Sequence, residues 1–206
     1  QSVTSNEQGG FSFEAYKHGK RLSQVSLQVP GEHNVQNALA VLAVIDQLDA
    51  SIEKASQALG EFLGAGRRFQ VLGEVAGVIV VDDYAHHPTE IRATLAAARA
   101  RYANRHVWAI WQPHTYTRTK LLFDEFASAF DDADTVLVTD VYRSREPLDA
   151  DFSSSQVVDA MEHVQAHYTG DLSYTADYFL AEVQPGAVLL VLSAGDATQI
   201  SERVLA

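Results

Sequence analysis

The sequence predicts an α/β fold, in which a mostly parallel sheet carries helices on both of its faces. From Arg67 onward, short and continuously apolar segments alternate with segments of helical periodicity. Continuous apolar strands are typical of a parallel sheet that is buried on both sides. The composition agrees with a globular protein, because 47% of the 206 residues are hydrophobic and 20% are charged, which excludes a largely disordered chain.

The segment before Arg67 predicts a smaller unit that begins with a β-hairpin. Phe11, Phe13 and Ala15 alternate with polar residues, and His18-Gly19-Lys20 turns the chain into a second strand within Leu22–Val29. A two-stranded hairpin is only marginally stable alone, so we expect it to edge a larger sheet. The first residue is not methionine and the first ten residues are polar, which indicates a fragment cut inside an upstream domain.

Two helices follow the hairpin. Apolar residues at helical spacing predict one helix between Val35 and Leu48 and another from about Ile52 to Leu63. Gly64-Ala65-Gly66 ends the second helix. We therefore predict a boundary between residues 1–66 and residues 67–206.

The second unit alternates strands and helices. Its predicted strands are Phe69–Glu74, Val78–Val81, Val107–Trp111, Thr135–Thr139, a short one near Ser173, and Ala187–Leu192. Its predicted helices are Thr89–Tyr102, Arg118–Phe130, Gln156–Ala166, Asp177–Val183 and Thr198–Leu205. Ligands of open parallel sheets bind beyond the carboxyl ends of the strands, so the residues after each strand are the first candidates for a site.

Polar clusters stand at four of these strand ends. They are Asp82–Glu90, Gln112–Thr119, Asp140–Pro147 and Ser193–Asp196. Each cluster alone is also explained by turns, helix starts or solvated loops. Four clusters at one edge of a sheet predict a binding or catalytic site.

Two of the clusters suggest alternative chemistry. Carboxylates and imidazoles are metal ligands, so the first cluster leaves a metal-dependent hydrolase open, with the candidate ligands Asp82, Asp83, His86 and His87. Adjacent histidines usually point apart, which weighs against a shared metal ion. In the second cluster Thr117 could cap a helix whose free N–H groups, together with Arg118, would hold an anion.

Amide and guanidinium groups near the unit boundary suggest nucleotide contacts. Asn34 and Asn37 lie three residues apart on one helix face and offer both donors and acceptors, which suit a purine edge. Plain helix caps would look the same. Arg67-Arg68 could clamp a phosphate, or could be a surface basic pair.

Several classes of function are excluded or disfavoured. A net charge of −12 argues against nucleic acid, and apolar stretches such as Ala187–Leu192 are far shorter than the ~20 residues of a membrane-spanning helix. The sequence has no basic N-terminal region followed by an apolar stretch, so we expect no signal peptide, and the absence of cysteine excludes a disulfide scaffold and a thiolate zinc site. The motifs G-x-x-x-x-G-K-[ST], G-x-G-x-x-G and G-x-S-x-G are also absent.

Taken together, these segments resemble the Mur ligases over nearly the whole chain. The matching segments are Gly31–Asn34 with Asn37–Ala40, Gly66–Phe69, Asp82–Glu90, Gln112–Thr119, Asp140 with Tyr142 and Arg145–Pro147, and Leu192–Asp196. The form Gln-Pro-His-Thr-Tyr-Thr-Arg-Thr favours the alanine-adding members of the family. A murein peptide recycling ligase shares the Asp-Asp-aromatic-Ala-His-His block and remains an alternative.

The resemblance implies a three-domain enzyme of which this chain is a part. Mur ligases have a UDP-sugar-binding domain, a central ATPase domain and a Rossmann-like C-terminal domain. Residues 1–66 would be the end of the central domain, as a hairpin with two helices, and residues 67–206 the whole C-terminal domain. The phosphate loop and the UDP-sugar domain would lie outside this sequence, so we expect the isolated fragment to be inactive.

The implied reaction is ATP-dependent amide formation in bacterial peptidoglycan synthesis, and hence in cell wall biogenesis, cell shape and cell division. The muramic carboxylate of UDP-N-acetylmuramate would become an acyl phosphate, and the amine of L-alanine would displace phosphate. The implied cofactors are ATP and Mg²⁺, the latter held mainly by the missing part of the central domain. The implied location is the cytoplasm. Neither the resemblance nor the sequence indicates an oligomeric state.

The resemblance also implies roles for individual residues. The implied nucleotide contacts are His33, Asn34 and Asn37 for adenine, Arg68 for the phosphates and Asp83 for the ribose. The implied amino-acid pocket contains Tyr84, His86, His114 and Arg118. No residue is implied as a metal ligand. Another ligase of the family has a lysine near the position of Ala85, and no role of that lysine transfers here.

Two of these residues have a chemical argument of their own. Arg118 suits the alanine carboxylate, because a guanidinium–carboxylate pair is a charge-assisted hydrogen bond. His86 is the candidate catalytic base, since a neutral imidazole accepts a proton near pH 7. The alternatives from other classes are the metal-dependent hydrolase and a binding module without chemistry.

Overall fold

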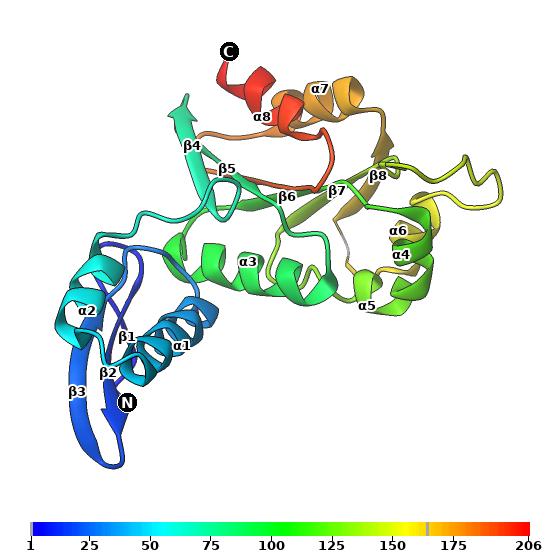
Figure 1. The fold of residues 1–206 in the computed structure, drawn as a ribbon. Coiled ribbons are helices and arrows are strands. Elements are labelled where there is room, and N and C mark those ends of the chain that lie inside the picture. Colours follow the sequence, from blue (N-terminus) through cyan, green and yellow to red (C-terminus); the bar gives the residue numbers. More distant parts are fainter. Residues whose placement is uncertain (1, 164) are drawn as a thin grey trace. The chain divides into compact units, whose positions relative to one another are not determined.

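The computed structural model describes residues 2–163 and 165–206 (Figure 1). The chain divides into two compact units, residues 1–65 and 66–206. This division lies one residue from the boundary that the glycines at 64 and 66 indicate. Each unit has a hydrophobic core of its own.

The first unit packs two helices on an antiparallel sheet. Its strands β1 (Thr4–Ser5), β2 (Phe11–Lys17) and β3 (Lys20–Ser26) pair in chain order, and the helices are α1 (Glu32–Gln47) and α2 (Ile52–Glu61). The predicted hairpin and both predicted helices are confirmed. Phe13, Leu27 and Leu42 are fully buried between the layers. The N-terminus of α2 is stabilised by Ser51, whose hydroxyl accepts the Lys54 N–H at 3.2 Å.

The second unit is built on a mostly parallel sheet, as predicted. Its strands are β4 (Gln70–Val75), β5 (Val78–Asp83), β6 (Val107–Trp111), β7 (Thr135–Thr139), β8 (Ala166–Gly170) and β9 (Val188–Leu192). The spatial order is β4-β5-β9-β6-β7-β8. Among the described strand pairs of this sheet, only β4–β5 is antiparallel, and a tight turn at Ala76-Gly77 joins its strands.

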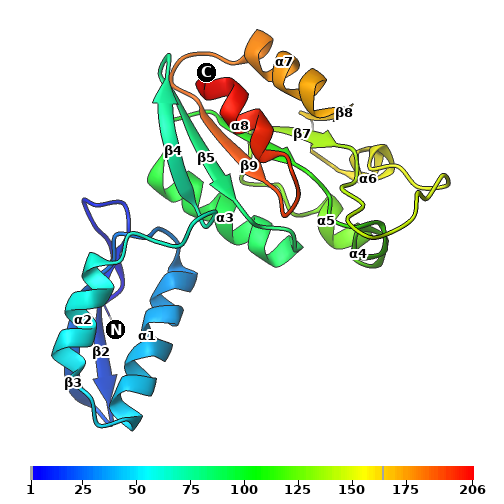
Figure 2. The same cartoon turned by 45° about the horizontal axis from the view of Figure 1, so that its top comes forward.

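Helices cover both faces of this sheet (Figures 1 and 2). One face carries α3 (Pro88–Arg101), α4 (Tyr116–Leu121), α5 (Phe123–Ala127) and α6 (Ser155–Ala160), and the other carries α7 (Leu172–Glu182) and α8 (Thr198–Leu205). Alternate strand residues enter the two cores, so Val81 packs under α3 and Val80 packs under α8. None of the helices in the described part of the chain is long and apolar enough to cross a membrane.

Three predicted elements are wrong in detail. The predicted helix Arg118–Phe130 is two short helices, α4 and α5, divided at Leu122. The predicted helix Gln156–Ala166 ends at Ala160, and Ala166 begins β8 instead.

The strand predicted near Ser173 does not exist, because Ser173 lies in the first turn of α7. The Asp171 carboxylate accepts the N–H groups of Ser173 and Tyr174 at 2.8 and 3.0 Å, so this helix begins earlier than apolar periodicity indicates.

The four polar clusters lie at one edge of the sheet, as the sequence predicts. The strands β5, β9, β6 and β7 are parallel neighbours in register, with Leu192 opposite both Asp83 and Trp111. Their carboxyl ends therefore meet at the same edge, and the loops that follow them lie together there.

Candidate active site

The end of β5 is fixed by an ion pair between the buried Asp82 and the partly exposed Arg67. Asp82 is almost fully buried, and its carboxylate accepts the Arg67 Nε–H at 2.9 Å. Arg67 also donates to the Ser193 carbonyl at 2.6 Å, and its guanidinium lies 5.1 Å from the centre of the Tyr84 ring. Burial raises the pKa of Asp82, and the Arg67 charge partly offsets this. Arg67 therefore holds the sheet edge together, and of the Arg67-Arg68 pair only Arg68 stays available for a phosphate.

Asp83, the predicted ribose contact, orders the surrounding backbone. Its two carboxylate oxygens accept the Phe69 N–H at 2.6 Å and the Ala85 N–H at 2.7 Å. Burial raises the pKa of Asp83, and these two N–H groups lower it in part. A carboxylate oxygen has a second lone pair, so a further donor can still be accepted.

The loop after β5 presents His86 with a defined tautomer. His86 Nδ1 lies 2.8 Å from the Tyr84 carbonyl oxygen, which only accepts, so the neutral ring carries its proton on Nδ1. The unprotonated Nε2 makes no hydrogen bond within the described residues. Glu90 accepts the His86 backbone N–H at 3.1 Å and lies 3.5 Å from Arg68 Nη1. We call Arg68, His86 and Glu90 the β5 cluster.

His87 has a structural role in this loop. It is the N-cap of α3, and its Nδ1 accepts the Thr89 N–H at 3.2 Å. Pro88 follows as the first helical residue, where the missing N–H costs nothing. His87 therefore turns away from its neighbour His86.

His114 and Arg118 meet after β6. Arg118 Nη1 donates to the His114 carbonyl at 2.8 Å and lies 3.4 Å from His114 Nδ1. A guanidinium only donates, so Nδ1 is the unprotonated nitrogen and Nε2 carries the proton. Burial lowers the pKa of His114, and the Arg118 charge lowers it further. His114 is therefore a neutral donor at pH 7.

Glu146 supports this segment from the loop after β7. Its carboxylate accepts the Thr115 hydroxyl at 2.6 Å and the Thr117 N–H at 3.1 Å. Partial burial would raise the pKa of Glu146, but these hydrogen bonds keep it below its ordinary value. The prediction that Thr117 caps α4 is wrong, because Thr115 is the N-cap and the Glu146 carboxylate binds the free N–H. We call His114, Arg118 and Glu146 the β6 cluster.

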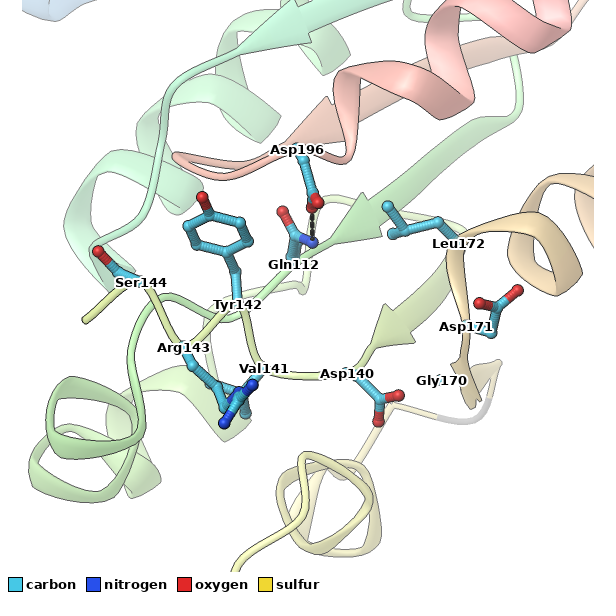
Figure 3. Close-up of a pocket in the computed structure, with 10 residues that line it drawn as sticks. All are labelled: Gln112, Asp140, Val141, Tyr142, Arg143, Ser144, Gly170, Asp171, Leu172 and Asp196. Atoms are coloured by element: carbon cyan, nitrogen blue, oxygen red, sulfur yellow. Dashed lines mark hydrogen bonds between the residues drawn. The ribbon is translucent and has the colours of Figure 1, made fainter. Parts of the chain in front are cut away.

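The same loop packs Tyr142 against the β6 cluster, and Figure 3 shows the cavity that Tyr142 lines. The Tyr142 ring stacks on His114 with centres 5.5 Å apart and planes 15° apart. It also lines a polar cavity of about 440 Å³ together with Gln112 and Asp196, whose side chains are joined by a 2.7 Å hydrogen bond. A Cβ on Gly195 would lie 2.5 Å from both Tyr142 Cγ and Gln112 Oε1, which explains the glycine in Ser193–Asp196.

The two clusters face one site. The His86 and His114 rings lie 6.2 Å apart, and Tyr84 packs edge-on against His86 at 5.2 Å. The structure thus brings together the predicted pocket residues Tyr84, His86, His114 and Arg118. At this site the unprotonated His86 Nε2 can accept a proton and His114 Nε2–H can donate a hydrogen bond, with Arg118 beside His114.

The predicted adenine contacts lie in the first unit, at the start of α1. Asn34 donates to the Pro30 carbonyl at 2.7 Å, and the exposed Asn37 donates to the Asn34 side chain at 3.2 Å. Gly31 has a φ of 91°, and a Cβ there would lie 2.5 Å from the His33 ring, so only glycine fits. The amide oxygen of Asn37 remains available as an acceptor.

The residues proposed for a metal-dependent hydrolase are engaged elsewhere. Asp82 pairs with Arg67, Asp83 binds backbone N–H groups, and His87 caps α3. In residues 2–163 and 165–206 no group of three or more histidine, aspartate or glutamate side chains is placed to hold a metal ion.

Comparison with known proteins agrees with this geometry. Residues 67–195 match the model of the family described as Mur ligase, glutamate ligase domain. The chain belongs to the Mur ligase family. The matched residues include both clusters and most of the second unit, so the Mur ligase fold accounts for the parallel sheet and its loops.

Several Mur ligases are similar to this chain over most of its length. The UDP-N-acetylmuramate–L-alanine ligase of Caldanaerobacter subterraneus is 42% identical over 207 aligned positions, covering 100% of this chain and 45% of that protein. The ligase of the same name from Geotalea daltonii is 44% identical, covering 94% of this chain and 43% of that protein. The chain therefore spans less than half the length of the Mur ligases it matches.

Solved Mur ligase structures show the same fold. The UDP-N-acetylmuramate–alanine ligase of Thermotoga maritima has a TM-score of 0.76 and 34% identity, over 92% of this chain and 40% of that one. A murein peptide ligase of Psychrobacter arcticus has a TM-score of 0.69 and 26% identity, over 95% of this chain and 41% of that one.

Sequence reasoning assigned no role to three residues that contact the candidate site residues. Glu90, Tyr142 and Glu146 were quoted within polar clusters but given no role. Glu90 lies in the first turn of α3, where the helix dipole alone favours an acidic side chain, so its position suggests no further role. Glu146 lies 31 residues from its partner Thr115, so no local pattern indicates the contact.

Proposed function

We propose that this chain is the C-terminal part of an ATP-dependent, ADP-forming ligase that adds L-alanine to UDP-N-acetylmuramate. The observation that carries the proposal is the 39–44% identity, over almost the whole chain, to ligases of that name. The proposed reaction makes an acyl phosphate on the muramic carboxylate, and the alanine amine then displaces phosphate. Residues 1–66 would be the last part of the central ATPase domain, and residues 67–206 would form the C-terminal domain.

The β6 cluster supports binding of the amino-acid carboxylate. Arg118 is partly exposed and uses one nitrogen for the His114 carbonyl, which leaves further donors for an anion. His114 contributes an Nε2–H donor, and its low pKa keeps it neutral, so Arg118 supplies the fixed positive charge. Tyr84 and the His114–Tyr142 stack form aromatic walls beside these donors.

The β5 cluster supports removal of the proton from the alanine ammonium. The neutral His86 ring directs an unprotonated Nε2 away from the Tyr84 carbonyl that holds Nδ1–H. A positioned base of this kind contributes about 10²–10⁴-fold to a rate. Arg68, whose side chain is 52% exposed, is free to turn toward a phosphate.

The nucleotide contacts are proposals that fit the groups present. Asn37 offers an amide oxygen at the start of α1, next to His33 and Asn34, and an amide oxygen suits an adenine amino group. Asp83 would accept a ribose hydroxyl on a remaining lone pair. Mg²⁺ would accompany ATP and be held mainly by the preceding part of the central domain, as the resemblance to the Mur ligases implies.

Peptidoglycan precursor synthesis in the bacterial cytoplasm is the proposed setting, because ATP and UDP-sugars are cytoplasmic substrates.

The murein peptide recycling ligase is less favoured, since identity to the solved structure of that class is 26%, against 34% for the alanine-adding ligase. We propose that the isolated chain does not turn over, because its sequence contains no phosphate loop.

The deciding experiment uses the intact parent protein. With UDP-N-acetylmuramate, ATP and Mg²⁺, we expect phosphate release that requires L-alanine and is lost in Arg118→Ala. Release that a preformed peptide stimulates instead would identify a recycling ligase. Phosphate release that depends on neither L-alanine nor a peptide, or no phosphate release at all, would reject both ligase assignments.

A further inference from the structure

Glu90 is placed between the two charged groups of the β5 cluster. Its Oε1 lies 3.5 Å from Arg68 Nη1. Its Oε2 accepts the His86 backbone N–H at 3.1 Å and lies 3.6 Å from His86 Nδ1. One oxygen of the Glu90 carboxylate therefore faces Arg68, the residue proposed to bind phosphate. The other oxygen faces His86, the residue proposed as the base.

A role in starting α3 does not explain this geometry. The N-cap is His87, whose own ring accepts the Thr89 N–H. In a capping box the glutamate binds the N–H of the N-cap residue. Glu90 instead binds the residue before the cap, which is His86. Its carboxylate thus stabilises the loop that carries the candidate base.

The two contacts of Glu90 differ in strength. The hydrogen bond from the His86 backbone N–H to Glu90 has an ordinary length. The same loop is also held by the hydrogen bond from the Tyr84 N–H to the Arg67 carbonyl. The Arg68 contact is long, and the two side chains are 52% and 34% exposed. Exposed pairs of this kind contribute ~0–1 kcal/mol, so a phosphate can replace the carboxylate on Arg68.

We propose that Glu90 is a positioning residue that connects the nucleotide half of the site to the base. Before ATP binds, Glu90 holds Arg68 beside the Tyr84 ring, where the guanidinium lies 5.7 Å from the ring centre. When Arg68 turns to a phosphate, Glu90 keeps only His86 and orients its Nδ1–H side. This inference rests on the proposed ligase function, and it adds to that function an exchange of partners on one carboxylate.

The test is Glu90→Gln in the intact parent ligase. Glutamine keeps an acceptor for the His86 N–H and removes the charge. We expect kcat to fall about tenfold, because the base is less well oriented. We expect KM for ATP to fall about threefold, because the carboxylate no longer competes for Arg68. A structural defect would lower kcat and raise KM together.

Two double variants separate the two contacts. In an Arg68→Met background, Glu90→Gln should no longer change KM for ATP but should still lower kcat. In a His86→Gln background, it should no longer lower kcat. Additive effects in both backgrounds would overturn the proposal, because independent residues give no interaction energy.

A readout without turnover uses ¹⁵N chemical shifts of the His86 ring in the intact parent ligase. We expect the Nδ1–H tautomer in the wild type and a larger share of Nε2–H in Glu90→Gln. The matched control is Glu202→Gln on the exposed face of α8, which should change neither the ring shifts nor the kinetics.

The outcomes distinguish the two proposals. A parent enzyme without alanine-dependent phosphate release would overturn the ligase function and this inference with it. An active parent in which Glu90→Gln behaves like Glu202→Gln would overturn this inference alone.

Discussion

The β5 and β6 clusters contain the same three residue types and connect them in opposite ways. In the β5 cluster the carboxylate faces the imidazole and the arginine is the outer member. In the β6 cluster the arginine faces the imidazole and the carboxylate binds the start of α4. Because His86 Nδ1 faces the Tyr84 carbonyl and His114 Nδ1 faces the Arg118 guanidinium, His86 presents an unprotonated Nε2 and His114 presents Nε2–H. The neighbour of Nδ1, and not the residue type, decides which histidine accepts a proton.

The largest effect should come from removing the arginine of the β6 cluster. We expect Arg118→Met to lower kcat/KM for alanine about 100-fold, because truncating one partner of a charge-assisted pair costs about 2–5 kcal/mol. Arg68→Met should raise KM for ATP and leave KM for alanine nearly unchanged. Steady-state kinetics of both variants check this, and equal effects on both substrates would refute the division of labour.

The ion pair at the end of β5 should matter more for folding than an exposed ion pair elsewhere in the chain. Arg67→Ala leaves the buried Asp82 charge without its partner, so we expect a loss of about 2–3 kcal/mol in the free energy of unfolding. Lys17→Ala, which breaks an exposed pair with Asp46, should cost less than about 0.5 kcal/mol. Chemical denaturation measures both. Similar losses would show that burial does not set the cost.

A smaller loss should follow from removing the support of the β6 cluster. Glu146→Ala removes the acceptor of the Thr117 N–H and of the Thr115 hydroxyl, so we expect a loss of about 1–2 kcal/mol. KM for alanine should rise as the start of α4 loosens. Glu146→Gln, which keeps an acceptor, should recover most of the stability; no recovery would mean that charge, not hydrogen bonding, holds the loop.

The smallest effect concerns the titration of His114. Burial and Arg118 hold its pKa below the ordinary value of 6.5, so the unfolded chain binds this proton first as pH falls. The contribution of His114 to stability is therefore complete above about pH 6.5 and is lost as pH falls through the lower folded pKa. In Arg118→Met the His114 pKa should rise toward its ordinary value, measured by NMR titration. An unchanged value would assign the whole shift to burial.

The sequence predicted the central strands of the second unit correctly but missed its edge strand β8. Continuous apolar strands such as Val107–Trp111 and Ala187–Leu192 carry a strong pattern, because both of their faces are buried. The edge strand β8 has the sequence Ala-His-Tyr-Thr-Gly, in which only Thr169 and Gly170 are buried. Its mixed polarity gives no periodic signal. An aspartate at position 171 is a typical helix N-cap and indicates the start of α7, whereas the spacing of apolar residues alone does not.

The candidate site shows the same limit. His86 and Arg118 were selected from local motifs, and the structure places both at one edge. The tautomers of His86 and His114 depend on a backbone carbonyl and on a guanidinium, and no motif specifies such contacts. Glu146 reaches Thr115 only after the loop following β7 has folded onto the loop following β6. Contacts that the tertiary fold creates are absent from the local pattern.

The strand order also has a consequence for synthesis on the ribosome. The strand β9 is the last of the described strands to be made, yet it lies between β5 and β6 at the centre of the sheet. Until it emerges, the nascent sheet consists of two halves, β4-β5 and β6-β7-β8, each with an apolar inner edge unpaired. Nascent domains with exposed strand edges are prone to aggregate. The inner edges of β5 and β6 therefore stay unpaired until Val188–Leu192 has been translated and can join the two halves.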